Sequence, residues 1–173
     1  DGVSSEDVKK AISKFQYGRT EKELAYDKQL FSIQCFNKKE IKIITQLCNL
    51  ILPLNEFGSI EDAEVPELIE FMAKDIPAYE APIKEGLLML DEISKQKNSK
   101  VFIDCNEIEQ KKILDQMAFP DPEISSSEQK EEVKWFSLMR NLTMTGYYTS
   151  KAGIDELGYV GNTPNVWDGV PQD

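Results

Sequence analysis

The sequence predicts an all-α protein, and three observations support this fold class. Apolar residues recur at spacings of three and four in several segments, which is the repeat of a helix with one buried face. No segment shows the sustained apolar and polar alternation of a strand, or a dipeptide that closes a β-hairpin. The length of 173 residues, with 40% hydrophobic and 29% charged residues, suits one folded domain. We expect a single helical domain, residues 1–173, of about five helices followed by an extended arm.

Three regions are expected along this domain. Residues 1–36 contain a short first helix, with Val8 and Phe15 on its apolar face, and a connection of mixed composition. Residues 37–148 form the helical core, in which several long segments have a helical apolar repeat. Residues 149–173 form a C-terminal arm.

The strongest helix signal begins at Asn37. Asn37 is a good N-cap, Glu40 stands at the third helical position as in a capping box, and Phe36 stands where a hydrophobic staple would. Much of this helix is apolar, so we expect it to be central and heavily buried. Its main apolar face comprises Ile41, Ile44, Leu47, Cys48 and Ile51. Pro53 marks its end.

Two more helices are expected in the middle of the chain. Residues 53–65 form a turn-rich, acidic connection, after which Pro66 occupies the first turn of a short helix. Pro77 and Pro82 mark the next junction. The helix that follows runs to about Gln96. Its apolar face comprises Ile83, Leu87, Leu90 and Ile93.

A fourth helix is expected to begin at Asp104 or Asn106, since either residue can cap its N-terminus. Pro120 and Pro122 close it, because proline cannot continue a helix. Its apolar residues are Ile108, Ile113, Leu114 and Met117.

The last long helix of the core follows Ser125 and Glu128, which have the spacing of another capping box. It runs to about Tyr147. One side of it carries Trp135, Met139 and Leu142. From Thr149 onward glycine and proline are frequent, so we expect an extended arm rather than another helix.

Charge and composition exclude several functions. The chain has 20 basic and 31 acidic residues, a net charge of −11, which would repel nucleic acid and anionic lipid headgroups. Because of this charge we expect no nucleic-acid partner. No stretch reaches the roughly 18 to 20 continuous apolar residues that cross a bilayer, so we also expect no direct membrane insertion. The chain has no histidine, which excludes His-based catalytic triads and removes the commonest metal ligand.

The three cysteines do not form a recognisable cluster. Cys35, Cys48 and Cys105 are an odd number, without a C-x-x-C pair or a haem-attachment motif. This pattern argues against structural zinc and covalent haem. Cys48 lies within an apolar helical run, so we interpret it as a small buried hydrophobic residue.

One acidic cluster could in principle hold a hard cation. It comprises Glu61, Asp62, Glu64, Glu67 and Glu70. Carboxylates suit calcium or magnesium, but the EF-hand spacing is missing, and a solvated acidic face is the alternative. The sequence also has no phosphate-binding glycine loop and no G-x-S-x-G element. We therefore expect no catalytic, cofactor-binding or metal-binding residue in this chain.

Large aromatic side chains gather toward the C-terminus. Tyr147, Tyr148, Tyr159 and Trp167 lie in or beside the segment rich in glycine and proline. Such residues are favoured where one protein docks on another. They could equally complete the core of their own domain, since tails that pack on their own domain are common.

Two stretches of the chain resemble a known family. The first comprises residues 36–40 (FNKKE), 51–53 (ILP), Gly58 and 63–69 (AEVPELI). The second comprises residues 142–150 (LTMTGYYTS), Gly153, 157–159 (LGY) and 167–169 (WDG). In this order they resemble the gluconate 2-dehydrogenase subunit 3 family. The resemblance covers residues 36–75 and 135–169.

The resemblance implies a small all-helical accessory subunit, exported to the periplasm, that accompanies a large FAD-dependent dehydrogenase subunit and often a cytochrome c subunit. The flavin and the haems are then held by those partners, and the small subunit supports maturation, export or stability of the flavoprotein. The partner-binding residues implied are those of the closing motif and the arm: Gly146, Tyr147, Tyr148, Thr149, Ser150, Gly158, Tyr159, Trp167, Asp168 and Gly169.

Two other hypotheses come from different classes of protein. A stand-alone ligand-binding protein would have an apolar pocket between the helices and the tail. A carboxylate-based metal enzyme would hold an ion at Glu61, Asp62 or Glu64. The chain starts at Asp1 without an initiator methionine or a hydrophobic leader, as either a trimmed sequence or a processed mature protein would, which is compatible with an export signal before it.

Overall fold

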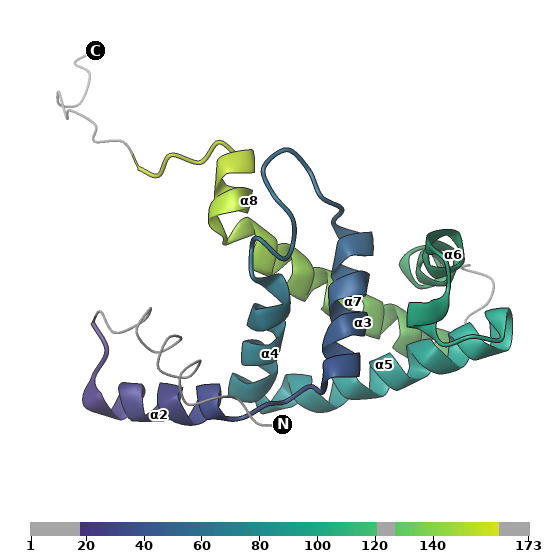
Figure 1. Ribbon diagram of the computed structural model, residues 1–173, viewed down its shortest axis with the longest axis horizontal. Coiled ribbons are helices and arrows are strands. Elements are labelled where there is room, and N and C mark those ends of the chain that lie inside the picture. Colours follow the sequence, from purple (N-terminus) through teal and green to yellow (C-terminus); the bar gives the residue numbers. More distant parts are fainter. Residues whose placement is uncertain (1–17, 121–126, 163–173) are drawn as a thin grey trace, which may run out of the picture.

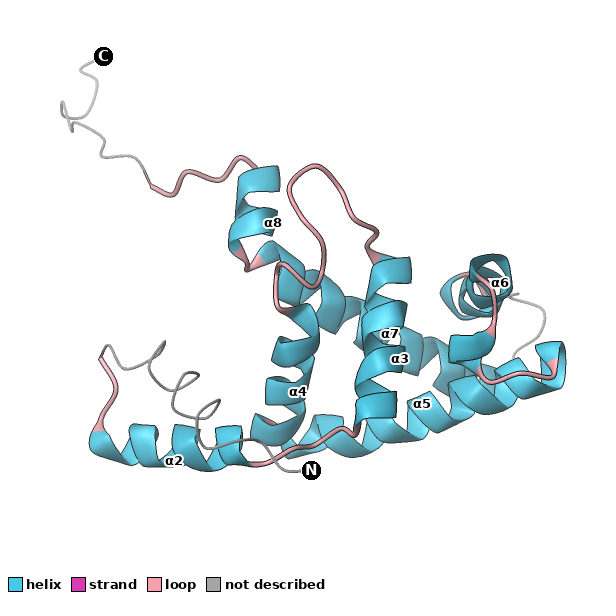
Figure 2. Ribbon diagram, in the orientation of Figure 1, coloured by secondary structure: helices cyan, strands magenta, loops and turns pink. Residues whose placement is uncertain are grey.

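The computed structural model describes residues 18–120 and 127–162. These residues form seven α-helices and one short 3-10 helix, and Figure 2 shows no strand among them. The helices are α2 (Glu21–Ser32), α3 (Lys38–Ile51), α4 (Val65–Asp75), α5 (Pro77–Asn98), η1 (Phe102–Asp104), α6 (Glu107–Ala118), α7 (Ser127–Tyr148) and α8 (Lys151–Glu156). The all-α fold class is confirmed. The first helix predicted around Val8 and Phe15 lies outside the described residues.

Helix α3 begins where the sequence predicts. The Asn37 side chain accepts hydrogen bonds from the backbone N–H groups of Lys39 and Glu40, at 2.9 and 3.0 Å. The Glu40 carboxylate returns a bond to the Asn37 N–H, which completes the capping box. Phe36 and the α3 residues Ile44 and Leu47 are fully buried, so α3 is central to the core.

Helix α2 was not predicted, because its apolar repeat is weak. Its start has a sequence signal nevertheless, since Thr20 and Glu23 form a capping box. The helix lies against α4, where the Tyr26 hydroxyl donates to Asp75 at 3.1 Å. The connection from α2 to α3 is held by Glu70, whose carboxylate accepts from the backbone N–H groups of Cys35 and Phe36.

The prediction that Pro82 marks a junction is wrong. Helix α5 begins at Pro77 and continues through Pro82. Pro77 suits the first helical position, where the missing N–H has no partner within the helix. Pro82 stands close to the start of the helix, so it removes only the bond that its N–H would have made to Ala78. The helix therefore tolerates it.

The sequence offered two residues, Asp104 and Asn106, as the N-cap of α6, and the structure shows which one it is. Asn106 is the N-cap, and it forms a capping box with Glu109. Asp104 belongs to η1 instead. Helix α6 ends at Ala118, just before Pro120. Pro122 and the capping box predicted for Ser125 and Glu128 lie outside what the structure describes.

Helix α7 is packed on several sides. It contacts α3, α4, α5, α6 and α8, and Figure 1 shows it passing behind α3 and α4. One cluster of buried side chains lies among these helices. It comprises Phe36, Ile43, Ile44, Leu47, Cys48, Ile60, Val65, Ile69, Ala73, Ile83, Leu87, Leu90, Phe102, Ile113, Leu114, Met117, Trp135, Phe136, Met139, Leu142 and Tyr147.

A buried polar network places η1 against the core. Asp91 on α5 accepts from the Phe102 N–H at 3.0 Å and pairs with Lys39 Nζ on α3 at 2.8 Å. The Gln110 amide on α6 donates to the Phe102 carbonyl and accepts from Gln46 on α3. Burying Asp91, Gln110 and the Phe102 backbone is tolerated because each has a partner of the complementary kind.

Helix α5 lies very close to the Trp135 side chain of α7 at Gly86. A Cβ atom built on Gly86 would lie 1.8 Å from Trp135 Nε1, so only glycine allows the indole to occupy this place. The Trp135 side chain is buried, and its Nε1 has no hydrogen-bond partner in the described part of the chain. The favourable packing of the indole over Gly86 therefore offsets the cost of leaving the Trp135 Nε1–H without a hydrogen bond.

We expect the substitution Gly86→Ala to lower the free energy of unfolding by about 1–3 kcal/mol, because the added methyl group overpacks the contact with Trp135. This loss exceeds the helix-propensity gain of about 1 kcal/mol that alanine brings elsewhere. Urea unfolding followed by circular dichroism measures the change. Leu88→Ala, at an exposed position on the same helix, is the control. Equal stability of the two variants would contradict the packing described.

Cys48 is a buried hydrophobic residue, as predicted. It is fully buried on α3, and the Thr143 hydroxyl of α7 lies 3.2 Å from its sulfur. Burial raises the pKa of this thiol from 9.0 to about 11, although the Thr143 contact acts in the opposite direction. The proton is therefore held more tightly in the folded state than in the unfolded state.

This difference in thiol pKa predicts a loss of stability in alkaline solution. The contribution of Cys48 is fully present below about pH 9 and is lost as pH rises toward about 11. The loss between about pH 9 and about pH 10 should be about 1 kcal/mol. Urea unfolding at both pH values measures it, with Cys48→Ala as the comparison. The same pH slope in both proteins would show that this thiol does not contribute.

Candidate functional site

Gly146, the first residue of the implied partner-binding set, faces the interior of the fold. A Cβ atom at this position would lie 3.1 Å from Leu68 Cδ2 and 3.2 Å from Val65 Cγ1, both on α4. The missing side chain therefore permits close packing of α7 on α4. The close approach that glycine allows here is to the chain's own helix.

The turn from α7 into α8 is built by Ser150 and Gly153. The Ser150 hydroxyl donates to the Tyr147 carbonyl at 2.6 Å and accepts from the Gly153 N–H at 3.3 Å, so it caps α8. A Cβ atom on Gly153 would lie 2.2 Å from the Tyr147 carbonyl oxygen. Glycine is thus required for the two helices to meet.

This geometry corrects the prediction of an extended arm from Thr149 onward. Lys151–Glu156 form helix α8 instead. The error arose because Gly153 was interpreted as a residue that disfavours a helix. In the structure it supplies space for a tight corner, and Ser150 supplies the cap. Residues 157–162 follow without helix, and residues 163–173 are outside the described part.

A hydrogen-bond network joins this corner to the loop that follows α3. The Tyr147 hydroxyl donates to Asn55 Oδ1 at 3.0 Å, and Asn55 Nδ2 donates to Glu156 Oε2 at 2.8 Å. The Tyr148 hydroxyl donates to the other oxygen of Glu156, at 3.2 Å. Burial raises the pKa of both tyrosines, so each hydroxyl keeps the proton that it donates.

Asn55 is a key residue that the sequence interpretation treated only as part of a turn. Its Oδ1 also accepts from the backbone N–H groups of Phe57 and Gly58, at 2.8 and 3.2 Å. Gly58 has a φ of 149° and lies against Ala152 of α8. The spacing Asn-x-x-Gly was the available signal, but only the fold shows that the turn lies on α8. Figure 1 shows the loop and α8 side by side.

Large apolar side chains are exposed on both sides of this network. On the loop, Leu54 is 69% exposed and Phe57 is 42% exposed. After α8, Leu157 and Tyr159 are each 63% exposed and Val160 is 84% exposed. Leu54 and Leu157 are the chain neighbours of Asn55 and Glu156, which are hydrogen-bonded to each other. We call these five residues the loop–α8 surface.

The implied partner-binding residues therefore have different surroundings. Gly146 and Tyr147 are buried, Tyr148 and Ser150 are half-buried, and Thr149, Gly158 and Tyr159 are exposed. Trp167, Asp168 and Gly169 lie outside the described residues. Direct contact of this set with a partner stays a prediction, and the first two residues serve the chain's own packing.

The acidic cluster that could have held a cation is dispersed over separate local contacts. Glu61 accepts from the Asn49 amide, and Glu70 binds the backbone of Cys35 and Phe36. Asp62 accepts from the N–H and hydroxyl of Ser59, which lowers the pKa of the carboxyl. Within residues 18–120 and 127–162, no three side chains of the metal-binding types are grouped to hold an ion.

The three cysteines differ in how far they are exposed. All three are free thiols, and Cys48 and Cys105 are buried. Cys35 is half-buried, and its pKa is raised to about 11, chiefly by burial and also by the charges of Glu80 and Glu70. Since the thiolate is the nucleophile and the metal ligand, a thiol with this pKa is inert near pH 7.

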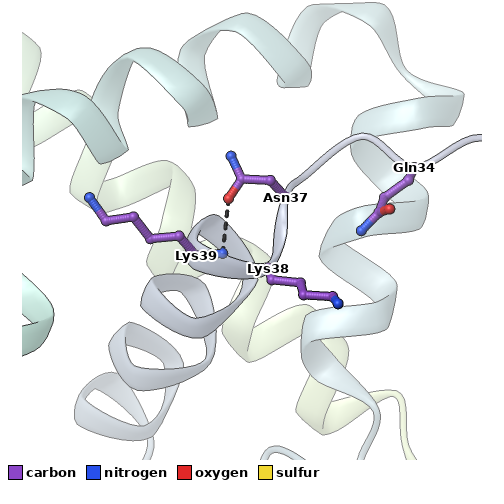
Figure 3. Close-up of a pocket in the computed structure, with 4 residues that line it drawn as sticks. All are labelled: Gln34, Asn37, Lys38 and Lys39. Carbon is purple, nitrogen blue, oxygen red and sulfur yellow. Dashed lines mark hydrogen bonds between the residues drawn. The ribbon is translucent and has the colours of Figure 1, made fainter. Parts of the chain in front are cut away.

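A hollow of about 320 Å³ lies at the start of α3. Figure 3 shows its lining side chains, Gln34, Asn37, Lys38 and Lys39. The Asn37 side chain is engaged in capping α3, and Lys39 Nζ pairs with Asp91. The hollow lies at the N-terminal end of α3 and not beside α8 and the tail, where the ligand-binding hypothesis placed its pocket.

The fold and the α7–α8 corner define a small all-α protein. Its loop–α8 surface exposes apolar residues on a loop and directly after a helix, and hydrogen bonds hold that loop and helix together. Of the helices that the structure describes, none is long and apolar enough to cross a bilayer. A family model for gluconate 2-dehydrogenase subunit 3 matches residues 38–169, so the chain belongs to this family. No curated protein and no solved structure matches it. The family is named for one subunit of a dehydrogenase, which is consistent with an accessory role.

We expect Asn55→Ala to release the loop from α8. The change removes the acceptor of Tyr147 and one partner of Glu156, which should cost about 1–3 kcal/mol of stability. Hydrogen exchange should become faster in residues 53–62 and 151–156. Asn49→Ala is the matched control, because the Asn49 amide bonds only the exposed Glu61. Equal exchange rates in the two variants would contradict the role of Asn55.

Proposed function

We propose that this chain is the non-catalytic small subunit of a periplasmic, FAD-dependent gluconate or sugar dehydrogenase complex. Its partner is the large flavoprotein subunit, and a cytochrome c subunit completes the complex in some of its forms. FAD and haem c belong to those partners. Membership of the gluconate 2-dehydrogenase subunit 3 family supports the proposal.

The observation that carries the proposal is the loop–α8 surface. Five large apolar residues are exposed on two segments that the Asn55 and Glu156 side chains hold together. A soluble domain seldom leaves apolar side chains grouped in this way unless something covers them. Aromatic residues such as Phe57 and Tyr159 are also enriched where proteins dock.

The corner below this surface favours tight docking. Tyr147, Asn55 and Glu156 fix the loop and α8 before any partner arrives. A surface that is already ordered loses little conformational entropy on binding. Binding to the folded flavoprotein would in turn stabilise that subunit by mass action, which accounts for a role in its maturation, export or stability.

Co-expression with a large FAD-dependent dehydrogenase subunit from the same organism tests the proposal. With an affinity tag on the small chain, we expect the two chains to copurify, with the flavin on the large one. The flavoprotein should also unfold at a higher temperature in the complex than alone. Two folded chains that do not associate would overturn the proposal, as would gluconate oxidation by the purified small chain alone.

The double substitution Tyr159→Ser and Val160→Ser should weaken the complex about tenfold or more, because it removes apolar area from the interface. Surface plasmon resonance with the purified flavoprotein measures the Kd. The control is Leu88→Ser with Phe119→Ser, two exposed apolar residues on α5 and at the end of α6. A similar loss in both double variants would show that the loop–α8 surface has no special role.

A further inference from the structure

The segment that carries Leu54 and Phe57 has a strongly one-sided charge. From Pro53 to Ile69 the chain has five acidic residues and no basic residue. All five carboxylates are exposed: Glu56, Glu61, Asp62, Glu64 and Glu67. No lysine or arginine of this segment is therefore present to neutralise them.

The acidic segment borders the apolar residues directly. Glu56 lies between Leu54 and Phe57 in the sequence, and Asp62 lies beside Gly58, which contacts Ala152 of α8. On α8, Asp155 is paired with Lys151 and Glu156 is engaged in the hydrogen-bond network. The loop–α8 surface thus has an apolar centre with an acidic border on the loop side.

Two of the five carboxylates have no partner within the described residues. Glu61 binds Asn49 and Asp62 binds Ser59, whereas neither Glu56 nor Glu67 makes a hydrogen bond or an ion pair there. Charges that the chain leaves unpaired at the edge of an apolar surface can pair with a docking protein. Such pairs act mainly on specificity and on the rate of association.

We propose that the loop–α8 surface binds a face of the flavoprotein subunit that is apolar at its centre and basic at its edge. This inference rests on the proposed function and specifies the chemistry of the contact. A second copy of this chain would bring the same carboxylates together and be repelled. An anionic lipid surface would be repelled for the same reason.

The test compares association rates of the purified flavoprotein with two double variants of this chain. Glu56→Gln with Glu67→Gln removes the two unpaired charges of the acidic segment, one beside the apolar residues and one in the first turn of α4. Glu21→Gln with Glu92→Gln removes two exposed charges on α2 and α5. Figure 1 shows these two helices along the side of the molecule opposite α8 and the loop. Both variants change the net charge equally, and unchanged unfolding temperatures show that both are folded.

We expect the first variant to associate about fivefold more slowly than the wild type at low ionic strength, and the control within about twofold. The difference should vanish near about 0.5 M salt, where screening is strong. Equal rates for the two variants, while the wild-type complex still forms, would overturn this inference and leave the proposed function standing. Failure of the wild-type complex to form would overturn both.

Two further measurements decide between the possible occupants of the surface. Sedimentation of the chain alone should show a monomer, and flotation with vesicles of anionic phospholipid should show no binding. A dimer that Tyr159→Ser dissociates would assign the surface to a second copy. Vesicle binding that the same substitution abolishes would assign it to lipid. Either result would overturn the inference.

Discussion

Helix α7 is approached very closely by its neighbours at three glycines, and two of these contacts require a glycine. Gly86 lies under the Trp135 indole, Gly146 lies against α4, and Gly153 lies against the Tyr147 carbonyl. A Cβ atom would lie 1.8 Å from its nearest neighbour at Gly86 and 2.2 Å at Gly153, which are clashes, and 3.1 Å at Gly146, which is a tight contact. The core and the α7–α8 corner therefore depend on the same constraint, which is backbone proximity along one long helix.

This constraint separates residues that build the frame from residues that are free to bind. Tyr147 is buried so that its hydroxyl can hold Asn55, and Asn55 holds the loop on α8. As a result the position of α8 is fixed, and Leu157 and Tyr159, which follow its last residue, are exposed. The similarity of the closing motif to a known family thus reflects internal architecture as well as any partner contact, and the exposed neighbours form the surface proposed for docking.

Local signals in the sequence predicted the helix starts well, because caps are decided within four residues. Asn37 with Glu40, and Asn106 with Glu109, form their capping boxes in the structure. Two predictions failed for different reasons. Pro82 is accommodated for a local reason, since it lies near the start of α5 and removes one backbone bond. Gly153 fits the corner between α7 and α8, which depends on how the two helices meet. Helix α2 was missed because much of its stability comes from docking on α4 rather than from its own apolar repeat.

By itself the sequence determined the all-α class, the buried central helix, the lack of a cysteine motif for metal or haem binding, and the family resemblance. These properties depend on composition, on apolar spacing and on short motifs, all of which are local. Only the tertiary structure decided that Gly146 and Tyr147 face inward, and that Asn55 meets Glu156 across 101 positions of the chain. The reason is physical: side chains so far apart become neighbours only after the helices pack, and no local pattern encodes which faces will meet.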